Sequence, residues 1–98
     1  MTKYEIIRSK EEIKVEVSEH AKYADKGYDI VCASISTAIT MTINALDNLG
    51  YNIIDFKKQD GYISFKVKSN DITLGLIKTL EECLKVLSED YPNYVNTK

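Results

Sequence analysis

The stretch from Ile30 to Leu49 most constrains what this chain can fold into, because it is long and rich in apolar and small residues. Its apolar positions recur at helical spacing, at Ile35, Ile39, Ile43, Leu46 and Leu49. Gly50, just beyond, is a typical signal for the end of a helix. Three threonines within the stretch are poor helix formers, so packing rather than propensity must hold the helix. The sequence therefore predicts a buried central helix over residues 30–49.

Short segments of alternating apolar and polar residues predict four strands. Thr2–Arg8 and Glu12–Ser18 are separated by three residues, a length that suits a hairpin. Tyr51–Lys58 and Tyr62–Lys68 are joined by a turn that contains an Asp-Gly pair, which is a strong hairpin signal. The four strands therefore form two hairpins, one before and one after the central helix in the sequence.

A second helix is predicted from Asp71 to Ser88, and Pro92 prevents its continuation. One stripe of this helix is apolar and consists of Leu76, Leu80, Cys83 and Leu87. The element order is then ββαββα. Because a sheet with one apolar face needs only one cover, we expect an α+β, two-layer fold with a four-stranded, mostly antiparallel sheet and two helices on one face. Residues 1–98, 44% of them hydrophobic, suffice for a single domain with one modest core.

Charge and composition argue against several classes of function. The formal net charge of −2 gives no general attraction to nucleic acid, which proteins usually bind through clustered Lys and Arg. Charged residues near the N-terminus interrupt the apolar run that a signal peptide needs, and no stretch approaches the roughly 18 apolar residues of a membrane span. We therefore expect a cytoplasmic protein that contacts neither membranes nor, directly, nucleic acid.

The two cysteines, Cys32 and Cys83, are expected to be reduced thiols in that compartment. There is no Cys-x-x-Cys pair and too few His and Cys residues for zinc, so we predict no metal and no cofactor. Cys83 lies in the apolar stripe of the second helix and is predicted to be a core residue. If Asp29 is the N-cap of the central helix, Cys32 lies in its first turn, where unpaired N–H groups and the helix dipole favour a thiolate. The Cys32 N–H is then also a candidate donor for an oxyanion hole.

The only histidine of the chain, His20, ends the second strand, and eleven residues separate it from Cys32. The small and polar segment between them can fold His20 back over the helix start, which brings a base within reach of a nucleophile. The residues alone leave two interpretations open: a catalytic pair, or a small core cysteine and an unrelated histidine. Asp29 either caps the helix or orients the imidazole. Ser36, one helical turn after Cys32 on the same face, either hydrogen-bonds the sulfur or substrate or only packs.

The residues around this pair resemble the signature of a known family. The run Ser18-Glu19-His20-Ala21, followed by Gly27-Tyr28-Asp29-Ile30-Val31-Cys32-Ala33 and Ser36, is similar to that of the bacterial ribosomal-processing cysteine proteases, the Prp family. The resemblance implies a Cys–His endopeptidase, acting as a homodimer, that removes a short N-terminal extension from a large-subunit ribosomal protein, the twenty-seventh, during ribosome maturation. Cys32 would be the nucleophile and His20 the base.

The chain departs from this signature where the family usually has glycines, at Glu19 and Lys22. A glycine at these positions permits a backbone conformation that other residues rarely adopt. Alternatively, the carboxylate of Glu19 lies near the imidazole and favours its protonated form. Two hypotheses compete with the protease: a non-catalytic, ribosome-associated binding domain with a structural cysteine, and a redox-sensing thiol protein.

Overall fold

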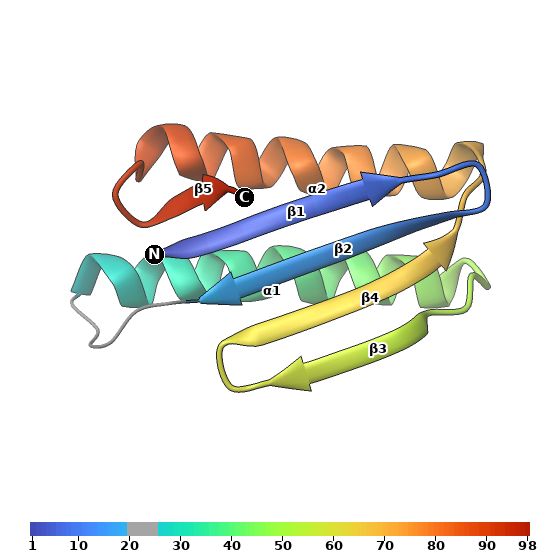
Figure 1. The fold of residues 1–98 in the computed structure, drawn as a ribbon, viewed down its shortest axis with the longest axis horizontal. Coiled ribbons are helices and arrows are strands. Elements are labelled where there is room, and N and C mark those ends of the chain that lie inside the picture. The colour runs from blue at the N-terminus through green and yellow to red at the C-terminus, as the bar shows by residue number, and fades with distance from the viewer. Residues whose placement is uncertain (20–25) are drawn as a thin grey trace.

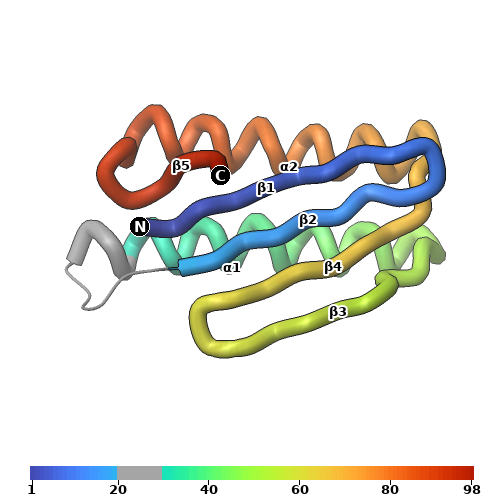
Figure 2. The backbone as a smooth tube through the Cα atoms, in the orientation of Figure 1, coloured from blue at the N-terminus to red at the C-terminus, as the bar shows by residue number. Residues whose placement is uncertain are grey.

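The computed structural model of the chain describes residues 1–19 and 26–98, without the side chains of residues 26–29. The helices lie on one side of the sheet, so the molecule has two layers, and the trace of the backbone shows the same arrangement (Figures 1 and 2). In chain order the described elements are β1 (Thr2–Arg8), β2 (Glu12–Glu19), α1 (Lys26–Asn48), β3 (Ile54–Gln59), β4 (Tyr62–Lys68), α2 (Asp71–Asp90) and β5 (Val95–Thr97).

Five strands form the sheet in the described residues, in the order β3-β4-β2-β1-β5. The two predicted hairpins are present, and β2 of the first pairs antiparallel with β4 of the second. The prediction of a four-stranded sheet and of the order ββαββα is wrong at the C-terminus, because β5 pairs parallel with β1 and makes the sheet mixed. A strand of three residues is too short to show a periodicity in the sequence. Backbone hydrogen bonds hold β5 beside β1 instead. The N–H of Thr2 in β1, for example, donates to the carbonyl of Tyr94, directly before β5, at 2.7 Å.

The end of the central helix was predicted well, but the following strand was not. Helix α1 ends at Asn48, and Gly50 has a φ of +86°, the left-handed conformation that glycine adopts readily at helix ends. The Tyr51 N–H donates to the carbonyl of Leu46 at 2.9 Å, so Tyr51 completes the helix end instead of joining the sheet. Strand β3 therefore begins at Ile54, three residues later than expected.

The core lies between the sheet and the two helices. Along β2, the side chains of Ile13, Val15 and Val17 are buried, as the alternation predicts. Ile13 and Val15 pair with the buried Val67 and Phe65 of β4. The buried hydrophobic residues of the cluster are Tyr4, Ile13, Val15, Val17, Val31, Ile35, Ile39, Leu46, Phe65, Val67, Ile77, Leu80, Leu84 and Val95.

One side of helix α1 packs into this core. From Ile30 to Asn48 it is long and apolar enough, by length and composition alone, to cross a membrane, which corrects the expectation that no stretch approaches such a span. Val31, Ile35 and Leu46 are nevertheless buried members of the core cluster. These residues serve the packing of the core, whereas Ile30 and Met41 of the same helix are exposed.

The apolar stripe of α2 is rotated from the predicted one. A capping box fixes its start: the Asn70 side chain accepts from the Thr73 N–H, and the Thr73 hydroxyl accepts from the Asn70 N–H, both at 2.9 Å. Thr73 therefore faces inward, and Ile77, Leu80 and Leu84 follow it into the core. The prediction that Cys83 is a core residue is wrong, because this rotation leaves its side chain exposed.

The solvent-facing side of the sheet carries a polar network around Glu16. The Tyr62 hydroxyl donates to the Glu16 carboxylate at 2.9 Å, the Lys98 ammonium group also donates to it, and the Lys14 ammonium group lies 3.8 Å away. These contacts hold the pKa of the Glu16 carboxyl below its usual value, chiefly through the hydrogen bonds from Lys98 and then Tyr62, although partial burial acts in the opposite direction.

We expect Glu16→Gln to lower stability near pH 7, and the difference from the wild type to shrink in acid. Because the pKa of the folded carboxyl lies below the unfolded value of about 4.3, its contribution is complete above that value and is lost as pH falls through the folded pKa. Urea unfolding between about pH 7 and pH 2.5 measures this, with Glu89→Gln at an exposed helix position as the matched control. A deficit that stays constant over this range would contradict the assignment.

Candidate active site

The end of β2 fixes the starting point of the segment that carries His20. The Glu19 N–H donates to the carbonyl of Gly61 at 2.8 Å, and on its other side Glu19 pairs with Thr2 of β1. Gly61 has a φ of +73° in the turn between β3 and β4, a conformation that other residues rarely adopt. His20 follows Glu19 directly and lies outside the described residues. The residue before it is therefore held from two sides by the sheet.

The helix that carries Cys32 begins earlier than predicted. Helix α1 starts at Lys26, so Asp29 is its fourth residue, and the prediction that Asp29 is the N-cap is wrong. Nothing in the sequence from Lys26 to Tyr28 breaks a helix as proline would, and each residue added upstream gains an intrahelical hydrogen bond. The Asp29 side chain lies outside the described ones, so its role in orienting the imidazole stays a prediction.

This longer helix changes the electrostatics expected at Cys32, which is the seventh residue of α1. The unsatisfied N–H groups of a helix belong to its first four residues, and the dipole effect on an anion falls off within the first turn. In the ladder of an α-helix the Cys32 N–H pairs with the carbonyl of Tyr28, four residues earlier. The helix start is therefore not a source of oxyanion donors at Cys32, and an imidazolium becomes the main predicted partner of a thiolate.

The Cys32 side chain is partly buried, at the border between the buried and exposed sides of α1. Val31 before it is fully buried, whereas Ala33 after it and Ser36, one turn further, are exposed. Neither Cys32 nor Cys83 is in a disulfide. Among the described residues, no cluster of three or more His, Cys, Asp or Glu side chains is placed to hold a metal ion.

A cleft of about 230 Å³ joins the end of β2 to the helix of Cys32. Glu19, directly before His20, and Ser36, one turn after Cys32, both line it. The structure therefore brings together the neighbours of both predicted catalytic residues, from elements that are distant in the sequence. Apolar and polar side chains share the lining, which consists of Val17, Glu19, Ile35, Ser36, Ile39, Thr40, Lys58, Gln59, Asp60, Gly61, Tyr62 and Ile63.

Sequence reasoning missed the contribution of the turn between β3 and β4 to this cleft. The Asp60-Gly61 pair was interpreted only as a turn signal, yet both residues line the cleft, together with Lys58. A local turn signal carries no information about which strand lies next to the turn. That neighbour is set by the pairing of β4 with β2, in which Tyr62 lies opposite Ser18, two residues before His20.

Several known proteins are similar to this chain in sequence and fold. Residues 1–96 match the family described as cysteine protease Prp. SMU.848 from Streptococcus mutans is 28% identical, with a TM-score of 0.79 over the whole of this chain and 92% of that protein. The essential ribosomal processing protease Prp from S. aureus is similar in two structures, each covering the whole of this chain and 98% of that one. The complex with a substrate peptide is 22% identical at a TM-score of 0.79, and the complex with a covalently linked product peptide 23% at 0.78. No curated protein sequence matches the chain.

Proposed function

Because this chain belongs to the Prp family of cysteine proteases, we propose that it is an endopeptidase with Cys32 as nucleophile and His20 as base. Its substrate is the precursor of a large-subunit ribosomal protein, the twenty-seventh, from which it removes the N-terminal extension during ribosome maturation. The observation that carries the proposal is the cleft shared by the end of β2, next to His20, and by α1, one turn from Cys32.

The proposed chemistry uses the two side chains in sequence. The imidazole of His20 takes the proton of the Cys32 thiol, and the thiolate attacks the carbonyl carbon of the scissile peptide bond. The C–N bond breaks, the imidazolium gives its proton to the leaving amine, and the N-terminal fragment stays on the sulfur as a thioester. Water, activated by the neutral imidazole, then hydrolyses this thioester and restores the thiol. The S. aureus complex with a covalently linked product peptide supports a mechanism with a covalent intermediate.

The partial burial of Cys32 favours this role over that of a structural cysteine. A structural cysteine is typically enclosed in the core, as the neighbouring Val31 is. Cys32 instead lies at the border between the buried and the exposed sides of α1. Glu19, which precedes the proposed base in the sequence, lines the cleft, and a carboxylate close to an imidazole favours its protonated form. The protein is proposed to act in the cytoplasm as a homodimer, without a cofactor and without direct contact with nucleic acid.

A peptide that copies the N-terminal extension and the first mature residues of the ribosomal protein tests the function. We expect the wild-type protein to cut it once, and iodoacetamide to stop the cutting at a rate equal to that of Cys32 alkylation, read by mass spectrometry of both thiols. Cys83 is exposed and is also expected to react, so the protein carrying Cys83→Ser serves as the matched control and should lose activity at the same rate. Binding of the peptide without cleavage would favour the non-catalytic binding domain instead.

A further inference from the structure

From Cys32 to Leu46 the exposed surface of α1 contains no charge. From Ile30 to Leu46 the sequence has no Asp, Glu, Lys or Arg, although 29% of the residues of the whole chain are charged. Much of this segment faces solvent; the side chain of Met41, for example, is 73% exposed. The solvent side of a helix normally carries charged residues, and charge is depleted where a surface is covered by a binding partner. The surface of α1 therefore has the composition of a binding face.

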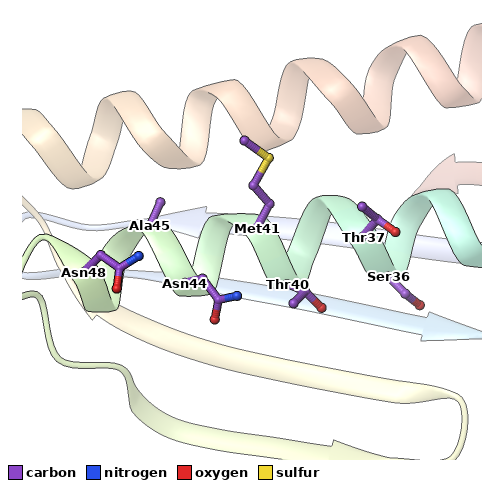
Figure 3. Close-up of a pocket in the computed structure, with 7 residues that line it drawn as sticks. All are labelled: Ser36, Thr37, Thr40, Met41, Asn44, Ala45 and Asn48. Carbon is purple, nitrogen blue, oxygen red and sulfur yellow. The ribbon is translucent and has the colours of Figure 1, made fainter.

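A row of small polar side chains continues this face from the proposed nucleophile. Ser36, Thr40, Asn44 and Asn48 follow Cys32 at intervals of four residues, and we call these four the α1 row. Together with Thr37, Met41 and Ala45 of the same helix, they line a shallow, open groove of about 590 Å³, and the side chains of the row project on the same side of α1 (Figure 3). The hydroxyls of Ser34 and Thr42, outside the row, bond back to helix carbonyls.

The groove of the α1 row is continuous with the cleft of the candidate active site. Ser36 and Thr40 line both of them, so a ligand that leaves the cleft along α1 passes directly into the groove. From Ser36 to Asn48 the helix rises about 18 Å. An extended peptide advances about 3.3 Å per residue, so the groove accommodates about five residues of substrate.

We propose that the α1 row binds the extended main chain of the substrate on one side of the scissile bond. Hydroxyl and amide groups both donate and accept hydrogen bonds, so they match the alternating N–H and C=O groups of an extended peptide whatever its side chains. The proposal rests on the proposed function, because it takes the scissile bond to lie at Cys32. The continuity of the groove with the cleft favours the substrate as the occupant over a second copy of the chain.

Three peptides test the proposal: a core peptide with about three residues on each side of the scissile bond, and two that extend it by about five residues toward the N- or C-terminus. For each variant we compare kcat/KM for an extended peptide with kcat/KM for the core peptide. For one of the two extended peptides, Thr40→Ala and Asn44→Ala should each lower this ratio by about two- to tenfold, mainly by raising KM. The double variant should lower it further. The matched control is Thr79→Ala, which removes an exposed threonine from α2 and should leave all three peptides unaffected. Thermal unfolding verifies that the variants fold.

Binding of the same peptides to the Cys32→Ser protein, measured by fluorescence anisotropy, keeps the test independent of cleavage. Weaker binding of one extended peptide in the Thr40→Ala and Asn44→Ala variants supports the α1 row even if no peptide is cut, in which case the proposed function alone fails. Cleavage with unchanged ratios overturns the α1 row and leaves the proposed function standing. Absence of both cleavage and binding overturns both. Light scattering measures the molecular mass of each variant in solution. A changed mass together with unchanged kcat/KM ratios would identify the row as a contact between copies and overturn the proposal.

Discussion

Cys32→Ser is expected to reduce cleavage of the ribosomal-extension peptide by at least about a thousandfold while the protein stays folded. Serine occupies nearly the same volume as cysteine, so the packing beside the buried Val31 is retained. Its hydroxyl does not ionise near neutral pH, however, and the imidazole of His20 is proposed to activate a thiol. Single-turnover kinetics with excess enzyme measure the chemical step, and circular dichroism verifies the fold.

The second cysteine provides the matched control for that experiment. Cys83 is also a thiol on a helix, but it faces a groove between α1 and α2, away from the cleft that contains Glu19 and Ser36. Cys83→Ser is therefore expected to cut at the wild-type rate. Equal activity of the two variants would show that the sulfur of Cys32 takes no part in the reaction, and the protease assignment of this site would have to be withdrawn.

Phe65→Ala is expected to cost about 3–5 kcal/mol of unfolding free energy, because it removes a ring from the centre of the core and leaves a cavity. Phe65 is 1% exposed, lies on β4 between β3 and β2, and pairs with the buried Val15. A domain of this size has a total stability of about 5–15 kcal/mol. If the stability of the wild type lies at the lower end of this range, the variant is close to unfolding, and urea titration at low temperature quantifies the loss.

The chain contains only one other phenylalanine, which makes the comparison direct. Phe56 lies on the edge strand β3 and is 50% exposed, so Phe56→Ala should cost about 1 kcal/mol or less. Similar losses for both variants would mean that the packing of the sheet against the helices contributes less to stability than the burial of Phe65 implies.

The sequence predicted those parts of the fold that are specified by residues close together in the chain. The alternation along β2, the Asp60-Gly61 turn and the glycine after α1 each act within a few residues, and the structure has all three. Strand β5 was missed because its three residues pair with the opposite end of the chain. The inward side of α2 was misjudged at Cys83 because the capping box at Asn70 determines the rotation of the helix, whereas the apolar pattern alone fits two neighbouring stripes.

For the site, the sequence indicated which residue types to pair but not their surroundings. Cys32 lies on the central helix, as predicted, but it is the seventh residue instead of a first-turn residue, because the helix begins at Lys26 and Asp29 is not its N-cap. The turn residues of the cleft come from a hairpin about forty positions away from His20, and only the register of β4 against β2 reveals that proximity. A cap signal marks where a helix is able to begin, and the helix can extend further upstream when no proline there blocks it.

The parallel pairing of β5 with β1 also dictates the order in which the fold is completed during translation. Thr2–Tyr4 are synthesised long before their partners Val95–Thr97, because almost all other residues of the fold lie between them in the sequence. Until then the outer edge of β1 has no strand beside it, and exposed edges are templates for intermolecular pairing. Closing a loop of almost the whole chain also carries a large entropic cost and slows folding. A nascent chain that stalls before residue 95 therefore has an exposed sheet edge at β1. In a chain that does not stall, β5 pairs with β1 only after nearly every other residue of the fold has been made.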